Sequence, residues 1–366
     1  MLFRSTWLEG GTPVTGYGDV TAAALSIYAE RTNDARVLKA LERHFDYVCE
    51  TLYPNFSRND CVDGRYWYTL TPFPYTAPSY LRFNRGKEYL ERWIERIGSI
   101  PQIGHYTGLS LQGLTALTGV LDAFPEIEPP PSVPLSTAFE GETEWPEITT
   151  RITRKDGWII TQSAPLSSLK SRWIFERQNL TSVFHHRLGL IIGGGHSVAM
   201  PEWSSFNIIG EGMVHYVPSE AELIENGLRV RYGDVWGTIR HEIVSAREIL
   251  LSYQVETIEE WQRALVRLPL WLPSNTRPDP VRIDSATHVL NVASTLSVPE
   301  NEPLIWRGYE IILSAESTFR YPVDGYTPYV KNGSARTQLR RQALIEVPLN
   351  HSTRTLTVRL RMTEEA

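Results

Sequence analysis

Cysteine is scarce in this sequence: only Cys49 and Cys61 occur in 366 residues. Two cysteines cannot build a disulfide scaffold or a cysteine-rich zinc site. Long apolar runs are also missing, since no stretch approaches the ~20 apolar residues of a membrane-spanning helix. We therefore expect no membrane partner. The N-terminal stretch Met1–Gly11 lacks an apolar core, so it predicts no signal peptide. The expected compartment is periplasmic or secreted if the chain is truncated, and cytoplasmic otherwise.

An excess of positive charge is missing too. The chain has 36 basic and 42 acidic side chains, which gives a formal net charge of −6. Nucleic-acid binding favours a basic face, so we expect no nucleic-acid partner. The apolar fraction of 42% is typical of globular proteins and excludes intrinsic disorder. The length suggests about two domains.

Helical patterns fill the first third of the chain. Asp19–Arg31 contains no glycine or proline and begins with an aspartate that can cap a helix. Ala35–Leu52 repeats apolar residues at spacings of three and four, and Thr32–Asp34 forms the predicted turn between these two helices. Further helices are predicted over Arg85–Ile97 and His105–Phe124. We therefore predict a helical domain over residues 1–126.

The pattern changes after a proline-rich linker, which we place at residues 127–146. Residues 147–366 predict a large antiparallel β-sandwich domain, because no helical period follows. Helices followed by strands indicate an α+β fold and argue against a Rossmann fold or an α/β barrel. The predicted strands lie within 148–161, 171–192, 228–241, 248–257, 288–296, 309–314, 342–347 and 353–361.

The segment Asn55–Lys87 is a long irregular connection with an unusual composition. It holds five basic and two acidic side chains within an acidic protein, together with eight aromatic residues. Arginine binds carboxylates in a bidentate manner, aromatic rings stack on sugar faces, and tyrosine can transfer protons. The segment therefore suits an anionic ligand such as a uronic-acid sugar. The alternative is a proline-containing crossover whose aromatic residues pack over helix ends.

The β domain and the last predicted helix offer a few further candidates. Strand alternation places Trp173, Phe175, Arg177 and Asn179 on one face, where they line a groove or, for the two aromatic residues, fill a sandwich core. His105 precedes a helix, and a helix N-terminus favours its neutral, basic form. Histidines in the β domain show no metal-ligand spacing. We therefore predict no cofactor and no metal ligands, and a structural divalent cation is the less favoured alternative.

The domain order resembles the (α/α)-toroid polysaccharide lyases, the group of heparinase II/III, chondroitin AC lyase and alginate lyase. Val62–Tyr68, continuing to Pro74–Tyr75, is similar to their Asp-Gly-Ser-Phe/Tyr region and the tyrosine that follows it. Phe184–His186, continuing to His196, is similar to their central sheet with its histidine. The resemblance implies an N-terminal partial (α/α) toroid of helical hairpins followed by the β-sandwich domain.

The resemblance also implies a reaction, the β-elimination of a uronic-acid-containing polysaccharide. Arg58, Arg65 or Arg82 would neutralise the substrate carboxylate. Tyr75, or else Tyr66 or Tyr68, would be the acid, and His185 or His105 the base. The further substrate-binding candidates are Trp67, Trp173, Arg177 and Asn179. The partner is an anionic polysaccharide or oligosaccharide.

Two alternatives belong to other functional classes. About four helices are readable where a full toroid has ten or more, so we expect either the C-terminal part of a larger ancestor or a partial toroid that a second copy or another partner completes. The carboxylate-neutralising asparagine or histidine of the family has no clear counterpart here. Both observations suit a non-catalytic glycan-binding or assembly module of the same fold. A glycoside hydrolase would need two carboxylates, for which Asp60 and Asp63 are the only suggestive pair in the segment Asn55–Lys87.

Overall fold

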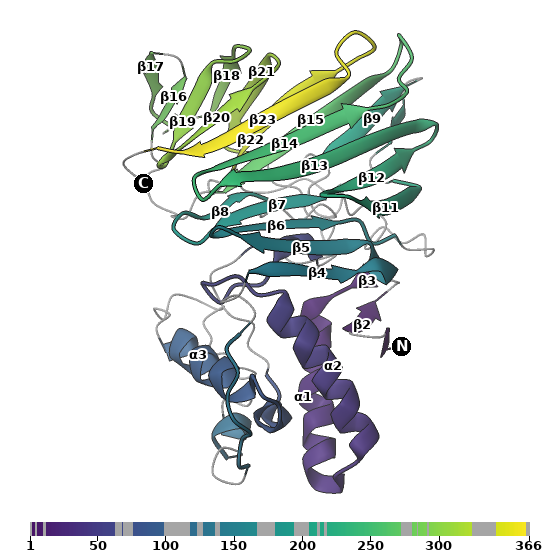
Figure 1. Cartoon of the computed structure of the whole chain (residues 1–366), viewed down its shortest axis with the longest axis vertical. Helices are drawn as coiled ribbons and strands as arrows, with labels where there is room; N and C mark the ends of the chain where they lie inside the picture. The colour runs from purple at the N-terminus through teal and green to yellow at the C-terminus, as the bar shows by residue number, and fades with distance from the viewer. Residues whose placement is uncertain are drawn as a thin grey trace. The chain divides into compact units, whose positions relative to one another are not determined.

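The computed structural model of the chain describes most of both predicted domains. The described residues are 2–3, 6–9, 12–62, 68, 76–98, 118–122, 127–135, 140–166, 180–193, 205–210, 213–215, 218–271, 280–283, 285–290, 293–323 and 342–363. The fold is α+β, with a few helices and two antiparallel sheets (Figure 1).

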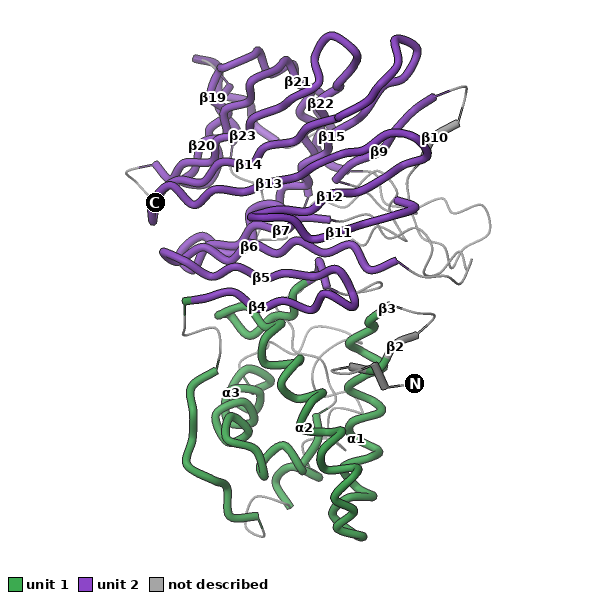
Figure 2. Tube along the Cα trace, turned by 45° about the vertical axis from the view of Figure 1, so that its right-hand side comes forward, with its two compact units in different colours: residues 1–59, 68–140 green, residues 60–67, 141–366 purple. Residues whose placement is uncertain are grey.

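The chain divides into two compact units, coloured separately in Figure 2. Unit 1 comprises residues 1–59 and 68–140, and unit 2 comprises residues 60–67 and 141–366. The short stretch 60–67 therefore leaves the helical part of the sequence and belongs to the β unit. This stretch lies inside the aromatic and basic segment Asn55–Lys87.

Unit 1 is built on an antiparallel pair of helices, α1 (Thr15–Thr32) and α2 (Ala35–Glu50). Asn33 ends α1 in a left-handed conformation, and Asp34 caps α2 by accepting a hydrogen bond from the Arg36 N–H at 2.9 Å. The predicted turn between them is thus confirmed. The other elements of unit 1 are η2 (Pro78–Arg82), α3 (Gly86–Gly98) and the small strands β1 (Leu2–Phe3), β2 (Thr6–Glu9) and β3 (Thr12–Pro13).

The start of α1 differs from the prediction. The helix begins at Thr15, so Asp19 lies inside it and is 2% exposed rather than capping its end. The first part of the predicted linker also packs on this unit, because Ile127 and Leu135 are buried in its core. The Leu135 N–H lies 3.2 Å from a carboxylate oxygen of Glu88 on α3. The last part of the predicted linker is strand β4.

Unit 2 contains a sheet of eleven described strands. Its main path runs β18–β21–β22–β15–β8–β7–β6–β5–β4, and β9 and β10 extend from β15. The bounds are β4 Gly141–Trp145, β5 Thr150–Lys155, β6 Trp158–Ser163, β7 Thr181–His185, β8 Gly189–Ile192, β9 Phe206–Gly210, β10 Met213–His215, β15 Arg263–Trp271, β18 Ser294–Val298, β21 Ser317–Tyr321 and β22 Gln342–Leu349. A single 3-10 turn, η4 (Pro146–Ile148), joins β4 to β5.

The second sheet of unit 2 has nine described strands, in the order β11–β12–β13–β14–β23–β20–β19–β16–β17. Their bounds are β11 Glu220–Ile224, β12 Gly227–Tyr232, β13 Val235–Ser245, β14 Glu248–Val255, β16 Val281–Ile283, β17 Ala286–His288, β19 Pro303–Trp306, β20 Tyr309–Leu313 and β23 Thr355–Met362. All pairings in both sheets are antiparallel, as the sequence predicted.

One apolar core joins the two sheets into a sandwich. Strand β23 shows the pattern of a half-buried strand, in which Leu356, Val358 and Leu360 are buried while the residues between them are exposed. Strand β6 is different, since all six of its residues are buried. Both faces of β6 must therefore be covered, and the same holds for β7, whose five residues are also buried.

The described residues of unit 1 contain fewer helices than a toroid has. Among the described residues, the α1–α2 hairpin, α3 and a helical stretch at residues 118–122 are present, so the partial toroid stays a prediction. None of the described helices combines the length and the apolar character needed to cross a membrane.

Candidate functional site

A short 3-10 helix, η1 (Asp60–Val62), is bound to one face of β6 and β7 within unit 2. The Ser182 hydroxyl on β7 donates to Asp60 Oδ2 at 3.1 Å, and the Cys61 thiol lies 3.8 Å from the carbonyl oxygen of Thr161 on β6. Thr161 and Ser182 are cross-strand partners, so the two contacts lie side by side. The inner face of β6 lies in the sandwich core, and η1 covers part of the other face.

Gly193 allows the chain to pass close to this contact. An added Cβ atom at Gly193 would lie 2.5 Å from Ser182 Oγ and 3.1 Å from Asp60 Oδ2, and its φ of +119° is rarely adopted by other residues. The Gly193 N–H donates to the carbonyl oxygen of Pro269 at 2.8 Å. Glycine is therefore needed at position 193 for close packing.

Gln342, the first residue of β22, completes this group. Its side-chain amide donates to the Gly193 carbonyl at 3.3 Å, and the side chain is 1% exposed. Its Oε1 atom is buried and has no hydrogen-bond partner among the described residues. We call Asp60, Ser182, Gly193 and Gln342 the anchor cluster. The Ser182–Asp60 hydrogen bond of this cluster holds η1 on the β unit, and a buried hydrogen bond is strong in a low-dielectric interior.

The anchor cluster holds η1, which lies inside the segment that carries the sequence-predicted site. Residues 63–67 follow η1 directly and include Arg65, Tyr66 and Trp67, which lie outside the described residues. Tyr75, His105, Trp173, Arg177 and Asn179 also lie outside them. The described part therefore fixes residues 60–62 of the aromatic and basic segment, and the roles of these eight residues stay predictions.

Arg58 lies in the interior of unit 1. Its Nη2 atom lies 2.9 and 2.8 Å from the two carboxylate oxygens of Asp19 on α1, and Arg58 is only 4% exposed. His44 Nε2 lies 3.8 Å from the same carboxylate, and burial lowers the pKa of His44, which favours its neutral form. Asp19 neutralises Arg58, so in this geometry the guanidinium stabilises unit 1 and does not meet a substrate carboxylate.

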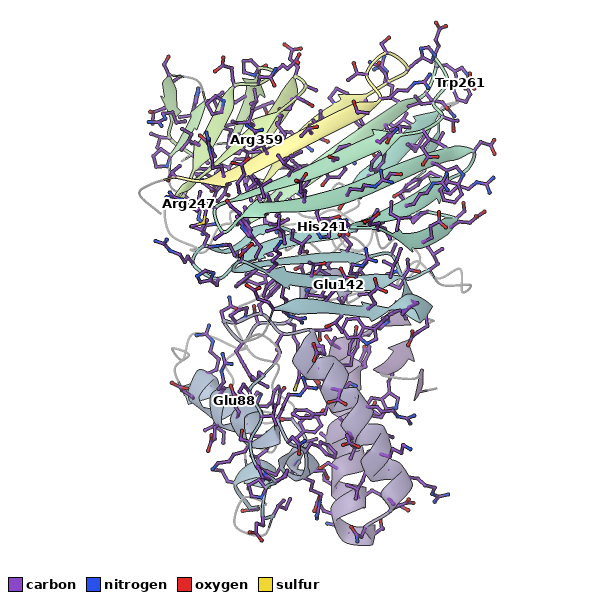
Figure 3. The ribbon with its side chains drawn as sticks, viewed as in Figure 1. Glu88, Glu142, His241, Arg247, Trp261 and Arg359 are labelled. Carbon is purple, nitrogen blue, oxygen red and sulfur yellow. The ribbon has the colours of Figure 1, made fainter. Side chains whose placement is uncertain are left out.

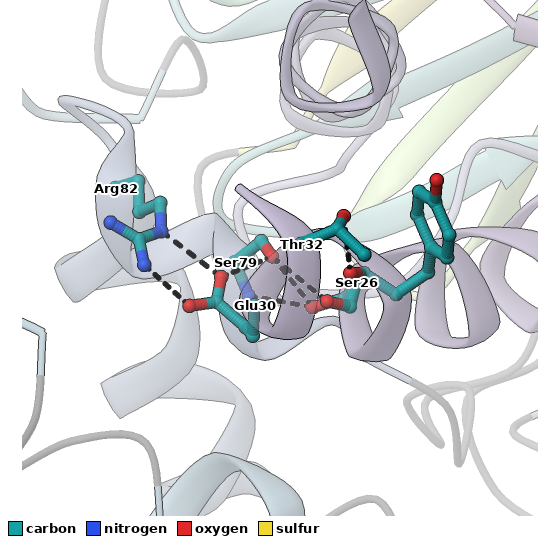
Figure 4. Close-up of polar contacts among 6 residues, drawn as sticks. Ser26, Glu30, Thr32, Ser79 and Arg82 are labelled. Atoms are coloured by element: carbon teal, nitrogen blue, oxygen red, sulfur yellow. Dashed lines mark hydrogen bonds and ion pairs between the residues drawn. The ribbon is translucent and has the colours of Figure 1, made fainter. Parts of the chain in front are cut away.

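Arg82 is held in a network between η2 and α1 (Figure 4). Its Nε atom donates to Glu30 Oε1 at 3.0 Å, and the Ser79 hydroxyl donates to the same oxygen at 2.5 Å. Ser26 and Ser79 are hydrogen-bonded at 2.8 Å. The hydrogen bond from Arg82 lowers the pKa of Glu30. This network fastens η2 to α1, so the geometry assigns Arg82 a structural partner in place of a substrate.

Tyr68 is buried in unit 1, with 3% of its surface exposed. Asn55 Nδ2 donates to its hydroxyl oxygen at 2.6 Å, and the ring of Tyr53 contacts its ring edge-on with centroids 5.9 Å apart. A phenol in this position supports the turn at Asn55. It is poorly placed to protonate a leaving group on a large substrate, which requires access.

His185, the last residue of β7, points into the sandwich core. Its ring contacts the ring of Trp158 in a tilted arrangement with centroids 4.5 Å apart, and its exposed fraction is 1%. Burial, with a smaller contribution from His186, lowers the pKa of His185 to about 4. Side chains alternate along β7, so His185 and Ser182 lie on opposite faces of the sheet. His185 is thus separated from η1, and its position does not suit a base in the same site.

No group of three or more histidine, cysteine, aspartate or glutamate side chains within the described residues is arranged to hold a metal ion. Little in the sequence indicates the anchor cluster. The sequence suggests Asp60 only as one of a carboxylate pair, and it does not predict Ser182 or Gln342. Their roles depend on contacts over 122 and 149 residues of sequence, which local patterns do not encode.

No family model matches the chain, and no curated protein sequence matches it either. Solved structures do. A heparinase III gene product superposes with a TM-score of 0.52 at 9% identity, covering 100% of this chain and 54% of that protein. A second heparinase III crystal structure superposes with a TM-score of 0.51 at 11% identity, covering 99% of this chain and 55% of that protein. A chondroitinase AC lyase superposes with a TM-score of 0.49 at 10% identity, covering 99% of this chain and 55% of that protein.

The chain is therefore similar in fold to the polysaccharide lyases, which confirms the resemblance predicted from the sequence. It spans about half the length of these solved lyases. The likeness concerns the fold, because identity near 10% does not carry residue roles from one protein to another.

Proposed function

We propose that this chain is a polysaccharide lyase-like protein that cleaves a uronic-acid-containing polysaccharide by β-elimination. The observation that carries the proposal is the anchoring of η1 on β6 and β7, which attaches residues 60–62 of the aromatic and basic segment to the β unit. The likeness of the whole chain to heparinase III folds supports it. The segment offers arginine for carboxylates and tyrosine for proton transfer.

The reaction needs three groups around the sugar. A base removes the proton from C5, the bond between C4 and O4 breaks, a double bond forms between C4 and C5, and an acid protonates O4. A cation beside the C6 carboxylate stabilises the charge that develops on it. Arg58 and Arg82 have carboxylate partners in unit 1, so we assign the cation to Arg65.

The remaining roles go to residues of the segment Asn55–Lys87 and of the last predicted helix. We assign the acid to Tyr75, with Tyr66 as the second candidate. We assign the base to His105 or to the tyrosine itself, because His185 is buried on the other face of its sheet. Trp67 would stack on a sugar face, and Trp173, Arg177 and Asn179 stay as candidate contacts in the β domain.

The test is the ultraviolet absorbance of the unsaturated product on alginate, heparin, chondroitin, hyaluronan and pectate, with and without EDTA. We expect absorbance to rise with at least one polymer. Tyr75→Phe should abolish the rise while leaving polymer binding intact. Tyr28→Phe is the matched control, since Tyr28 is 48% exposed on α1 and should leave the rate unchanged. An unchanged rate in Tyr75→Phe would remove Tyr75 from the mechanism.

A second candidate function is a non-catalytic glycan-binding or assembly module. The observation that favours it is length, because the chain covers only 54% of the heparinase III structure that it resembles. A second copy of the chain, or another protein, would then supply the missing part. Saturable binding of an anionic polysaccharide with no absorbance change on any of the five polymers would support this function over elimination.

A further inference from the structure

A second polar feature of unit 2 lies at the edge of the nine-stranded sheet, where Figure 1 shows β16, β17 and β19. A pocket of about 630 Å³ opens there, and it is far larger than a single inorganic ion requires. Pockets for small molecules fall between about 300 and 1,000 Å³. The residues that line it include Arg282, Thr287, Ile305, Arg307, Gly308 and Thr363.

The register of the strands places Arg282 on the outer face of the sheet. Arg282 on β16 is directly opposite Thr287 on β17 and Ile305 on β19, so the three side chains share one face. The neighbours of Arg282 along the strand, Val281 and Ile283, are buried in the sandwich core. The exposed Arg282 guanidinium has no ion pair or hydrogen bond within the part of the chain that the structure describes.

Arg307 contributes a second positive charge. It lies with Gly308 in the turn between β19 and β20, where both have positive φ, +52° and +83°. Its Nη1 and Nη2 atoms donate to the carbonyl oxygens of Trp271 at 2.5 Å and Leu188 at 3.3 Å. Carbonyl acceptors orient the guanidinium without neutralising its charge. The Thr363 N–H donates to the Gly308 carbonyl at 2.8 Å and brings the end of the described chain to the pocket.

The surroundings of the pocket are positive although the whole chain carries a formal charge of −6. Arg247, labelled in Figure 3, donates to the Thr363 carbonyl at 2.8 Å and, like Arg282 and Arg307, has no ion pair with a described carboxylate. Glu310 lies on the same face opposite Ile305, and Arg361 binds it. Seven other arginines of unit 2 do pair with carboxylates: Arg151, Arg229, Arg231, Arg267, Arg320, Arg359 and Arg361.

We propose that this pocket binds an anionic saccharide unit bearing a sulfate or carboxylate group, as a second polysaccharide-binding site on unit 2. The guanidinium of Arg282 would bind the oxyanion in a bidentate manner. The hydroxyls of Thr287 and Thr363 would hydrogen-bond sugar hydroxyls, and Ile305 would contact the apolar ring face. The identity of the polymer rests on the proposed function, whereas the chemistry of the pocket stands on its own residues.

The test measures binding of three hexasaccharides to the full chain by titration calorimetry: one from heparin, one from alginate and neutral maltohexaose. Sodium sulfate alone is the fourth probe. The heparin and alginate arms distinguish a sulfate from a carboxylate as the recognised group. We expect binding of at least one anionic hexasaccharide and none of maltohexaose. Arg282→Gln should weaken this binding by about tenfold, the usual worth of a charge-assisted hydrogen bond.

The matched control is Arg359→Gln. Arg359 lies on the same sheet, is 49% exposed and pairs with Glu248, so this variant removes the same charge away from the pocket. It should change the affinity by less than about twofold. Equal weakening by both variants, no effect of Arg282→Gln, sulfate binding as tightly as the hexasaccharide, or no anionic binding at all would overturn the proposal.

Elimination assays on the parent chain, run beside titrations of Tyr75→Phe, which should bind polymer without cleaving it, separate this proposal from the proposed reaction. Binding that depends on Arg282, with no elimination by the parent chain on any polymer, would support the pocket and reject the lyase reaction. Elimination in the parent chain, with binding that is insensitive to Arg282→Gln, would support the reaction and reject the pocket.

Discussion

The single residue with the largest expected effect on stability is Arg58. Breaking a buried ion pair leaves a charge without compensation, which costs about 3–5 kcal/mol. We therefore expect Arg58→Gln to lower the free energy of unfolding by this amount, because Asp19 is buried beside it. Urea denaturation followed by circular dichroism measures the change.

The control for Arg58→Gln is Arg36→Gln, in which the lost ion pair with Asp34 lies at the surface with Arg36 90% exposed. This variant should leave the urea midpoint unchanged. A stable Arg58→Gln variant with reduced polysaccharide binding would contradict the structural role and restore Arg58 as a substrate contact.

Gly193→Ala tests the close approach at the anchor cluster. The added methyl group would meet Ser182 Oγ at 2.5 Å on a backbone with φ of +119°, so we expect a loss of about 2–4 kcal/mol in the free energy of unfolding. Gly141→Ala is the control, because Gly141 has φ of +141° and no atom within 4 Å of an added Cβ. Gly141→Ala should lower the free energy of unfolding by about 1–2 kcal/mol through backbone strain alone. Equal losses in a thermal or urea titration would show that packing at Ser182 is unimportant.

At the scale of elements, η1 holds residues 60–62 of the aromatic and basic segment on the β unit. Asp60→Ala removes the acceptor of the Ser182 hydroxyl, so η1 should open more often while the sandwich stays folded. We expect trypsin to cleave after Arg65 about fivefold faster, since cleavage follows local opening. Mass spectrometry of timed digests gives the rate.

Asp234→Ala is the control for this digestion, because Asp234 lies in the same unit with a fully exposed side chain. Its rate should match that of the unchanged chain. Ser182→Ala removes the same hydrogen bond from the other side and should accelerate cleavage as Asp60→Ala does. Identical rates in all four chains would mean that η1 does not depend on this bond.

The elements that the sequence predicted are those with a clear local pattern. α2 and β23 repeat apolar residues at the periods of a helix and a strand, and both lie close to their predicted ranges. β15 was missed although it is central in its sheet, because Pro269 interrupts its pattern. The start of α1 was misplaced because Gly16 and Gly18 argued against helix. Gly18 is needed where an added Cβ would lie 2.7 Å from the ring of His44.

At the scale of the whole molecule, buried histidines make stability depend on pH. Burial lowers the pKa of both His185 and His241 to about 4, from about 6.5 in an unfolded chain. The unfolded state therefore binds more protons between pH 6.5 and 4, so the free energy of unfolding should fall as pH decreases through this window. Urea midpoints measured at pH 7, 5.5 and 4 will show the slope.

The contribution of His185 is isolated by His185→Phe, which keeps a ring against Trp158. Between pH 6.5 and 4, we expect the free energy of unfolding of this variant to fall by about 2 kcal/mol less than that of the unchanged chain. His351→Gln is the control, since His351 is exposed and its loss should leave the slope unchanged. A slope identical in His185→Phe would place His185 in contact with solvent.

The sequence by itself determined the α+β class, the antiparallel sheets, the α1–α2 hairpin and the resemblance to the toroid lyases. The individual elements follow from local periodicity and turn chemistry, which can be recognised within about 20 residues, and the class and the resemblance follow from the order of these elements along the chain. The unusual composition of Asn55–Lys87 is equally local, so the sequence also located the candidate region.

Only the tertiary structure decided which residues of that region have other partners. Arg58 and Arg82 meet carboxylates 39 and 52 residues away, and Asp60 meets Ser182 across 122 residues. Arg282 joins Thr287 and Ile305 only through the register of three strands. The charge of a side chain determines which groups it can bind, whereas the fold determines which of these groups lie beside it and whether it is exposed to water.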